Sequence, residues 1–386
     1  MKREMIFFLS IALLVFFLGM GHRASAEDES LVWEYWQENV PDTNIKAMKM
    51  PPAFVPYEGT WVPFDPCEGI AVPQGTRNAW LRVHVPSDLR GGDSLFFTTI
   101  DQSVQVYLDG VSIYRYGSSD PKLRGYGRKW HLVGLPAWAA GQELFIRVTT
   151  DNPWVIGQLN RVHVDRETEL VKQLFIHDFS YAAGLTAIAV FMMVIAVYFV
   201  ADRARRGIYL RLMLLLTVFF IWMFSSSNVI FLWFDWPEFW WRTEQVSSFL
   251  LPITGNILLY EVVDRQYRKW IVRLNNVFVV LFVVGVIAEM MGQFGLYMIQ
   301  FPYIPALSVW CGCVAYALWK SGKAGNKHAA ALLIALLIIV PLGIIDALAF
   351  QYRLYEAQTS FTPFSIYTIC FFIIQLILDR AESERR

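Results

Sequence analysis

The fold of the amino-terminal part of the chain follows from the stretch SVQVYLDGVSIY, residues 103–114. Apolar Val104, Val106 and Leu108 recur at every second position, a pattern typical of a strand with one buried face. The dipeptide at 109–110 is Asp-Gly, which best accepts the positive φ angles of a two-residue turn. The stretch therefore predicts an antiparallel β-hairpin.

The same alternation occurs in two other stretches, 79–85 and 143–149. In the first, Leu81 and Val83 point one way and Arg82 the other, as expected of half-buried strands. The surrounding sequence is polar and rich in Gly and Pro. A segment of about 145 residues is long enough to form one hydrophobic core. We expect 27–171 to form an extracytoplasmic all-β domain, a sandwich of jelly-roll type.

The amino terminus has the pattern of a targeting segment. Lys2 and Arg3 are basic, 5–20 is almost wholly apolar, and 24–26 is Ala-Ser-Ala. A small-x-small pattern after a short apolar run is typical of a signal-peptidase site. We expect 1–26 to be a cleaved signal peptide, with an uncleaved anchor helix as the alternative.

Beyond the β-domain the chain consists of long apolar runs, each approaching the roughly 20 residues that cross a bilayer as a helix. We expect a seven-helix transmembrane domain over 172–379. The expected spans are 179–201, 208–227, 244–263, 274–291, 299–319, 329–350 and 363–379.

The connections between these spans predict their orientation, because cytoplasmic loops carry an excess of Lys and Arg. The second, fourth and sixth connections hold only Arg242 and Arg353. The first, third and fifth hold ten basic residues: Arg203, Arg205, Arg206, Arg265, Arg268, Lys269, Arg273, Lys320, Lys323 and Lys327. We expect the β-domain outside, in the periplasm or the exterior, and the carboxyl terminus in the cytoplasm.

Composition agrees with a membrane protein that has a soluble part. Of the 386 residues 55% are hydrophobic and 17% charged, against about a quarter charged in soluble domains. Thirty-three basic residues balance 33 acidic ones. A nucleic-acid binder would show a basic excess, so the expected partner is the lipid bilayer and not a nucleic acid.

The order of the strand phrases is similar to a galactose-binding-type jelly roll. The phrases are AWLR at 79–82, VYLDG at 106–110, IYRYG at 113–117 and LFIRV at 144–148. With a signal segment and seven spans, the architecture resembles the bacterial seven-transmembrane receptors with diverse intracellular signalling modules. The resemblance implies a carbohydrate-binding-like sensor that detects an extracytoplasmic ligand and signals through the helices.

Members of that family usually continue into a diguanylate cyclase, histidine kinase or phosphatase domain, whereas this sequence stops at Arg386. Residues 380–386 are charged and are either the start of a cytoplasmic signalling helix or an anchoring tail. The expected partner is a fused output domain or a separate cytoplasmic signalling protein. A signalling helix also favours a homodimer.

The chain as it stands carries no recognisable catalytic residues, so we do not expect an enzyme. Gly91-Gly92-Asp93-Ser94 is similar to a cyclase signature but lies on the wrong side of the membrane and is typical of a turn. Cys311 and Cys313 are too close for the usual metal pair. We expect no metal and no cofactor.

Sugar recognition would need aromatic platforms and planar hydrogen-bonding groups in the loops of the β-domain. Core packing is the alternative for each such aromatic. The ligand-binding candidates are Tyr116, Arg128, Trp130, His131, Trp138, Asp151 and Trp154.

Two features of the helical part are candidates for coupling. Asp346 lies inside the sixth expected span. An ionisable group is costly there, so Asp346 is a candidate for a switch or coupling role in the helices. The alternative is that Asp346 lies near the outer interface and bonds to a neighbouring helix or to water. The second connection, 228–241, is rich in Trp and Phe. It is either an interfacial aromatic belt or a docking surface beneath the β-domain.

These patterns predict a transmembrane signalling receptor for an extracytoplasmic carbohydrate or small molecule. One alternative is the sensor half of a diguanylate cyclase or histidine kinase whose catalytic domain is missing. Another is a transporter with a substrate-trapping β-domain. The odd span count and the scarcity of intramembrane charge stand against transport.

Overall fold

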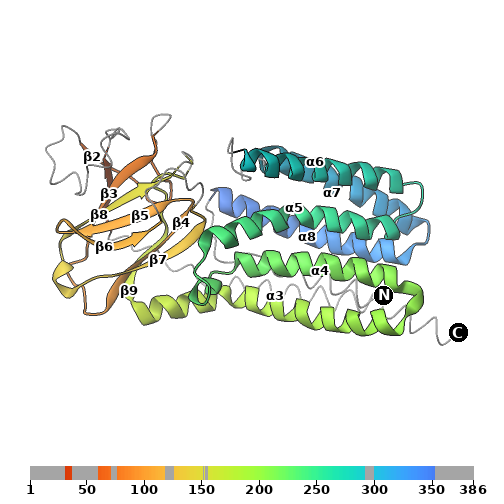
Figure 1. The fold of residues 1–386 in the computed structure, drawn as a ribbon, viewed down its shortest axis with the longest axis horizontal. Helices are drawn as coiled ribbons and strands as arrows, with labels where there is room; N and C mark the ends of the chain where they lie inside the picture. Colours follow the sequence, from red (N-terminus) through yellow and green to blue (C-terminus); the bar gives the residue numbers. More distant parts are fainter. Residues whose placement is uncertain are drawn as a thin grey trace.

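The computed structural model shows a β-domain seated at one end of a bundle of long helices (Figure 1). The helices run side by side away from the sheets. The structure describes residues 31–36, 60–70, 76–117, 126–150, 152, 155–291 and 300–352.

Nine strands are described, all paired antiparallel, in a six-stranded and a three-stranded sheet. The larger sheet has the order β2-β1-β3-β8-β5-β6 and the smaller β7-β4-β9. The strands are β1 Trp33–Trp36, β2 Trp61–Pro63, β3 Asn78–His84, β4 Asp93–Ile100, β5 Ser103–Leu108, β6 Val111–Tyr116, β7 Arg128–Gly134, β8 Glu143–Thr149 and β9 Asn160–Arg166.

One hydrophobic core draws on both sheets. Leu81, Val106 and Ile146 of the larger sheet and Leu95 and Phe97 of the smaller are at most 2% exposed. The three predicted strands are therefore confirmed as β3, β5 and β8, which are neighbours in one sheet.

The predicted hairpin is confirmed as well. Asp109 and Gly110 join β5 to β6 with φ angles of 47° and 74°. Gly92, in the Gly-Gly pair predicted to form a turn, has φ 93° and immediately precedes β4. Both turns use the left-handed backbone conformation that glycine adopts without a steric penalty.

The outward face of the larger sheet departs from simple alternation. Trp80 points away from the main core yet is only 2% exposed. It packs with Tyr107 and Phe145 on neighbouring strands, and its ring centroid lies 5.5 Å from that of Tyr107. Large aromatics on adjacent strands bury one another, so this face holds a second, smaller cluster.

Six long helices are described after the sheets. Short 3₁₀ turns accompany them: η2 Ala137–Ala139 in the β-domain, η3 Arg203–Arg205 and η4 Val229–Leu232. The helices are α3 Glu167–Ala201, α4 Arg206–Ser226, α5 Pro237–Val262, α6 Arg268–Met290, α7 Gln300–Lys323 and α8 Lys327–Tyr352.

Among the described residues, four helical segments are long and apolar enough to cross a membrane, which indicates a membrane protein. They are Asp178–Ala201, Arg203–Ser226, Arg268–Met290 and Pro302–Lys323. Lys327–Ile338 of α8 is an apolar stretch of shorter length. The expected seventh span, 363–379, lies outside the described residues.

The expected third span, 244–263, coincides with α5, which is too polar to meet the same criterion. The reason is that α5 lies between α4 and α6 and buries polar side chains inside the bundle (Figure 1). Ser247 and Thr254 are at most 5% exposed and donate to carbonyls of their own helix. Such back-bonding satisfies a hydroxyl without a partner helix.

The shared core makes a testable prediction about the β-domain. Leu81→Ala should lower its free energy of unfolding by about 3 kcal/mol, because a fully buried side chain is replaced by a cavity. Val111→Ala, at a side chain that is 62% exposed, should cost less than about 1 kcal/mol. Tryptophan fluorescence of the detergent-solubilised chain in urea measures both. Equal losses would contradict the assigned core.

Candidate functional site

Four of the seven residues predicted to bind a ligand lie together where β6 and β7 meet the helices. Tyr116 ends β6, and Arg128, Trp130 and His131 belong to β7. The aromatic rings of Tyr116 and His131 are 5.1 Å apart.

Of the other three candidates, only Trp138 is described, and it is not part of this group. Trp138 lies in η2 and is 56% exposed. Asp151 and Trp154 lie outside the described residues. Ligand binding by all seven stays a prediction.

His131 is fully buried between the two sheets. Its Nδ1 lies 2.9 Å from the Tyr114 hydroxyl and its Nε2 2.8 Å from the Thr99 hydroxyl, while Phe97 stacks on the ring. Burial, and then the positive charge of Lys129, lower the pKa of His131 well below its ordinary value. The imidazole is therefore neutral, with one nitrogen donating and the other accepting.

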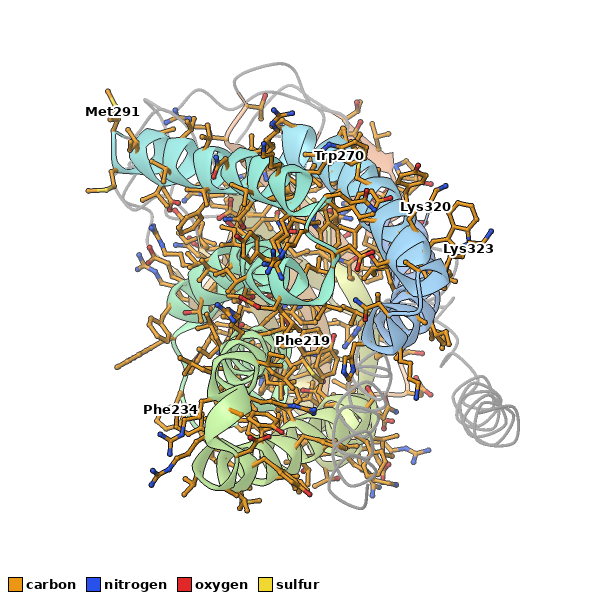
Figure 2. All side chains as sticks on the ribbon, turned by 90° about the vertical axis from the view of Figure 1, so that its right-hand side faces the viewer. Phe219, Phe234, Trp270, Met291, Lys320 and Lys323 are labelled. Carbon is orange, nitrogen blue, oxygen red and sulfur yellow. The ribbon has the colours of Figure 1, made fainter. Side chains whose placement is uncertain are left out.

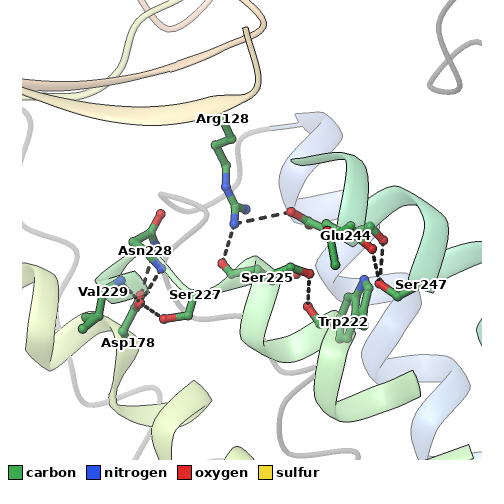
Figure 3. A network of polar contacts seen from close by, with 11 residues as sticks. Arg128, Asp178, Trp222, Ser225, Ser227, Asn228, Val229, Glu244 and Ser247 are labelled. Atoms are coloured by element: carbon green, nitrogen blue, oxygen red, sulfur yellow. Dashed lines mark hydrogen bonds and ion pairs between the residues drawn. The ribbon is translucent and has the colours of Figure 1, made fainter. Parts of the chain in front are cut away.

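Three consecutive residues at the start of β7 bond to the helical part, and Figure 3 shows the contacts of the first of them, Arg128. Arg128 donates to the carbonyl of Ser226, the last residue of α4, and Lys129 pairs with Asp235. The indole Nε1 of Trp130 donates to the carbonyl of Asn228 at 3.0 Å. One strand end thus holds the whole connection between α4 and α5.

That connection is also held from α3 by one buried carboxylate, Asp178, which is 3% exposed. It accepts from the Ser227 hydroxyl at 2.7 Å, from both the backbone and side-chain nitrogens of Asn228 at 2.5 and 3.0 Å, and from the Val229 amide at 2.8 Å (Figure 3). These amides begin η4, so Asp178 acts as a cap supplied by another helix.

An apolar contact lies beside the polar one. Phe96 and Trp130 stack with ring centroids 6.3 Å apart, and they pack against Leu170 and Leu174 of α3. Both leucines are at most 4% exposed. The first turns of α3 therefore pack on the smaller sheet and, through Asp178, hold the helical connection.

Gly127 marks how closely the two parts approach. Its φ is 73°, and a Cβ at this position would stand 2.4 Å from the Pro237 carbonyl oxygen at the start of α5. No side chain fits there without moving the β-domain from α5. The backbone approach thus requires glycine, both for its conformation and for its size.

The contact contains buried polar atoms without a hydrogen-bond partner among the described residues. They are Arg128 Nε, Ser226 Oγ, Glu244 Oε2 and Gln245 Nε2. Arg128 and Glu244 are 3.5 Å apart, which is an ion pair but not a good hydrogen bond. Each unsatisfied buried group costs about 1–3 kcal/mol. The contact is therefore less stable than one in which all of these groups are bonded.

Asp235 extends the network to the other sheet. Burial, and then the negative charge of Asp235, raise the pKa of Tyr114 and Tyr116 well above the ordinary value. Lys129 Nζ stands 5.8 Å from the Tyr116 ring and 5.7 Å from the Phe231 ring. The charge pair thus sits in an aromatic surrounding contributed by both parts of the molecule.

Some aromatic residues of the connection 228–241 fit a docking surface beneath the β-domain, and others fit an interfacial aromatic belt. Phe231 is 5% exposed and faces Lys129, as a docking residue would. Trp233 and Trp236 are 71% and 67% exposed, as residues of an interfacial belt would be.

A hollow of about 700 Å³ opens in the β-domain beside the start of α3. The Gly92 carbonyl near it accepts from the Glu167 amide at 3.4 Å, the first residue of α3. Acidic and basic side chains both line it, which suits a small polar molecule with several hydrogen-bonding groups. They are His84, Asp88, Arg90, Asp93, Asp165 and Arg166.

Asp346, the predicted coupling residue, lies within α8, and its side chain is not described. Its role stays a prediction. Within the described ranges no group of three His, Cys, Asp or Glu could hold a metal ion.

Comparison of the chain with family models, curated proteins and solved structures gives no match. The site therefore has to be interpreted from its own geometry.

Sequence reasoning missed Lys129, Asp178, Asp235 and Glu244. A signal existed for two of them, because Asp178 and Glu244 are acidic residues at the start of expected spans 179–201 and 244–263. Which strand they meet depends on the packing of the sheets, and no local pattern reports that.

Asp178→Ala should lower the free energy of unfolding of the whole chain by about 3 kcal/mol, because it leaves the Ser227 hydroxyl and two backbone amides buried without an acceptor. Asp178→Asn keeps one acceptor oxygen and should lose less. Thermal unfolding in detergent ranks the three proteins. An alanine variant as stable as the parent would contradict the capping role.

His131 should make stability depend on pH. Its pKa is lowered in the folded chain, so below about pH 6.5 the unfolded chain binds a proton that the folded chain does not. Stability should therefore fall as the pH drops from 7 to 5, by up to about 1.4 kcal/mol per pH unit. His131→Gln should flatten this slope, whereas His84→Gln, at a side chain 47% exposed, should retain it. Equal slopes in both variants would refute the assignment.

Proposed function

We propose that this protein is a bacterial inner-membrane receptor whose β-domain detects an extracytoplasmic small molecule and whose helices relay the signal to a cytoplasmic output. The single observation that supports it best is the contact of Arg128, Lys129 and Trp130 with the connection between α4 and α5. A β-domain that served only as an anchored binder would not need to hold the helix ends.

The ligand site in this proposal is the hollow beside the start of α3. Its mixed charges favour a molecule with hydroxyl and carboxylate groups, and sugars and small carboxylates are the first probes. Arg90 and Asp93 lie in the turn that bonds to the first residue of α3. A ligand held there would act directly on that helix.

Relay then requires two arrangements of the contact that the ligand distinguishes. In this proposal the atoms of Arg128, Ser226, Glu244 and Gln245 that lack a hydrogen bond would find partners in a second arrangement. A shift of β7 moves the end of α4 and the start of α5 together. We take this to favour a receptor over a transporter, because the contacts join the β-domain to helix ends.

The finer architecture belongs to the same proposal. We take the β-domain to be a jelly roll outside the cell membrane, and the helices to be seven spans ending in the cytoplasm. Basic Lys320 and Lys323 lie at the end of the bundle far from the sheets, the end that faces the viewer in Figure 2. Such an excess is typical of the cytoplasmic side. Residues 380–386 would lead to an output domain or partner.

Gly127→Ala tests the relay and has a matched control. Gly141 shares the positive φ, 72° against 73°, but a Cβ there meets nothing within 4 Å. Both alanine variants carry the same backbone strain, and only Gly127→Ala pushes the β-domain from α5. We expect Gly127→Ala to keep ligand affinity and lose the response of the helices, and Gly141→Ala to keep both.

The response can be measured without knowing the output. Spin labels at Arg203→Cys and Lys323→Cys, in a chain with its native cysteines replaced, report the distance between two exposed far ends of the bundle. A ligand found by thermal shift should change that distance distribution in nanodiscs. A Gly127→Ala protein that responds like the parent would refute the relay. A panel of sugars and carboxylates without any hit would refute small-molecule sensing.

A further inference from the structure

A second hollow lies among the helices, at the end of the bundle far from the sheets. Its volume is about 200 Å³, and it opens between α4, α5 and α6. Tyr260 and Val272 form its rim, with 37% and 44% of their surface exposed. The lining residues are Arg211, Asn256, Ile257, Tyr260, Ile271, Val272 and Asn275. We call this hollow the inner groove.

The depth of the inner groove matches the headgroup region of a bilayer leaflet. Asn256 lies six residues before the end of α5 and Asn275 seven residues after the start of α6. At about 1.5 Å per residue both are about 10 Å from the helix ends. With the helix ends taken as the polar boundary of the bilayer, the groove would reach from that boundary to the top of the hydrocarbon.

Two amides in the inner groove are incompletely bonded. Asn256 is 1% exposed; its Oδ1 accepts from the Trp310 indole at 2.7 Å, while its Nδ2 has no partner among the described residues. Asn275 Oδ1 is likewise buried without a partner there. At this depth an unpaired amide is costly, so the groove is built to bond an occupant.

The charge of the inner groove favours an anion. Arg211 pairs with Glu261 at 3.0 Å, which leaves this pair neutral overall. Arg268 stands over the Tyr260 ring, 4.9 Å from its centroid, and its Nε has no partner in the described part of the chain. Arg268 does not line the groove but stands at its Tyr260 rim, so these three charged groups leave a net positive charge beside the groove.

Water alone could fill such a volume but would leave the positive charge uncompensated. A phosphate matches the Asn256 and Arg268 donors, and the glycerol hydroxyls of a headgroup match the acceptor on Asn275. We infer that the inner groove binds the phosphate of an anionic lipid headgroup from the surrounding leaflet. This inference is independent of the receptor proposal.

Phosphatidylglycerol and phosphatidylcholine, added to the purified full chain in a neutral detergent, test the inference. Phosphatidylglycerol should raise the midpoint of thermal unfolding, and phosphatidylcholine, which carries no net charge, should raise it less. Titration gives an apparent Kd. Arg268→Gln should weaken that Kd about fivefold, for a lost charge, and Asn275→Leu should also weaken it about fivefold, for the lost hydrogen bond to a glycerol hydroxyl.

Each variant has a neighbour as its control. Lys269→Gln removes a positive charge from the next residue, which neither lines the groove nor stands over Tyr260 as Arg268 does. Asn276→Leu removes the next amide along the same turn, and Asn276 does not line the groove. Both should keep the parent Kd. If Asn275→Leu fails to fold, Val272→Trp blocks the groove from its exposed rim. Equal effects of the two lipids, or equal Kd values in groove and control variants, would overturn the inference.

A soluble probe shows whether the groove recognises the headgroup phosphate alone or needs the whole lipid. Glycerol phosphate that competes with the lipid would locate recognition in the headgroup phosphate itself. Failure to compete, with the variant pattern intact, would show that the acyl chains against Ile257 and Val272 are needed as well. Either result supports the lipid site. If phosphatidylglycerol does not raise the midpoint of thermal unfolding, the site is refuted.

Discussion

The carboxylate of Asp178 is the interaction on which the rest of the contact depends. It holds the turn after α4 by four hydrogen bonds, and it does so from α3, the helix that also packs on the smaller sheet. Because that turn is fixed, its carbonyls point at β7, where Arg128 and Trp130 can reach them. One buried charge thus organises a surface made of three helices and a strand.

Much of the fold followed from local patterns, because those patterns reflect local physics. Alternation in 103–108 and the Asp109-Gly110 turn need only the pleat of a strand and the freedom of glycine. The burial of Trp80 could not be predicted from local patterns, because it depends on aromatic residues of neighbouring strands. The helix α5 was expected for its apolar residues, while its polar ones, such as Asn256, are explained only by the neighbours that bury them.

The candidate site was predictable in part. Tyr116, Arg128 and Trp130 were selected as loop residues for a sugar, and the structure places them against the helices instead of leaving them in open loops. His131 was selected with them and lies in the core, because a neutral imidazole can satisfy two hydroxyls at once. Side-chain type was thus informative about chemistry, whereas the choice between partner and ligand depended on the tertiary arrangement.

The junction of β9 and α3 has a mechanical consequence. The strand ends at Arg166 and the helix begins at Glu167, so the sheet and a helix of 35 residues form one continuous piece. At about 1.5 Å per residue that helix is about 50 Å long. The amino-terminal end of this helix is fixed to the β-domain, so the helix and the sheets tilt together. Because the helix is so long, a tilt of a few degrees at the sheets displaces the far end of the helix by several ångströms.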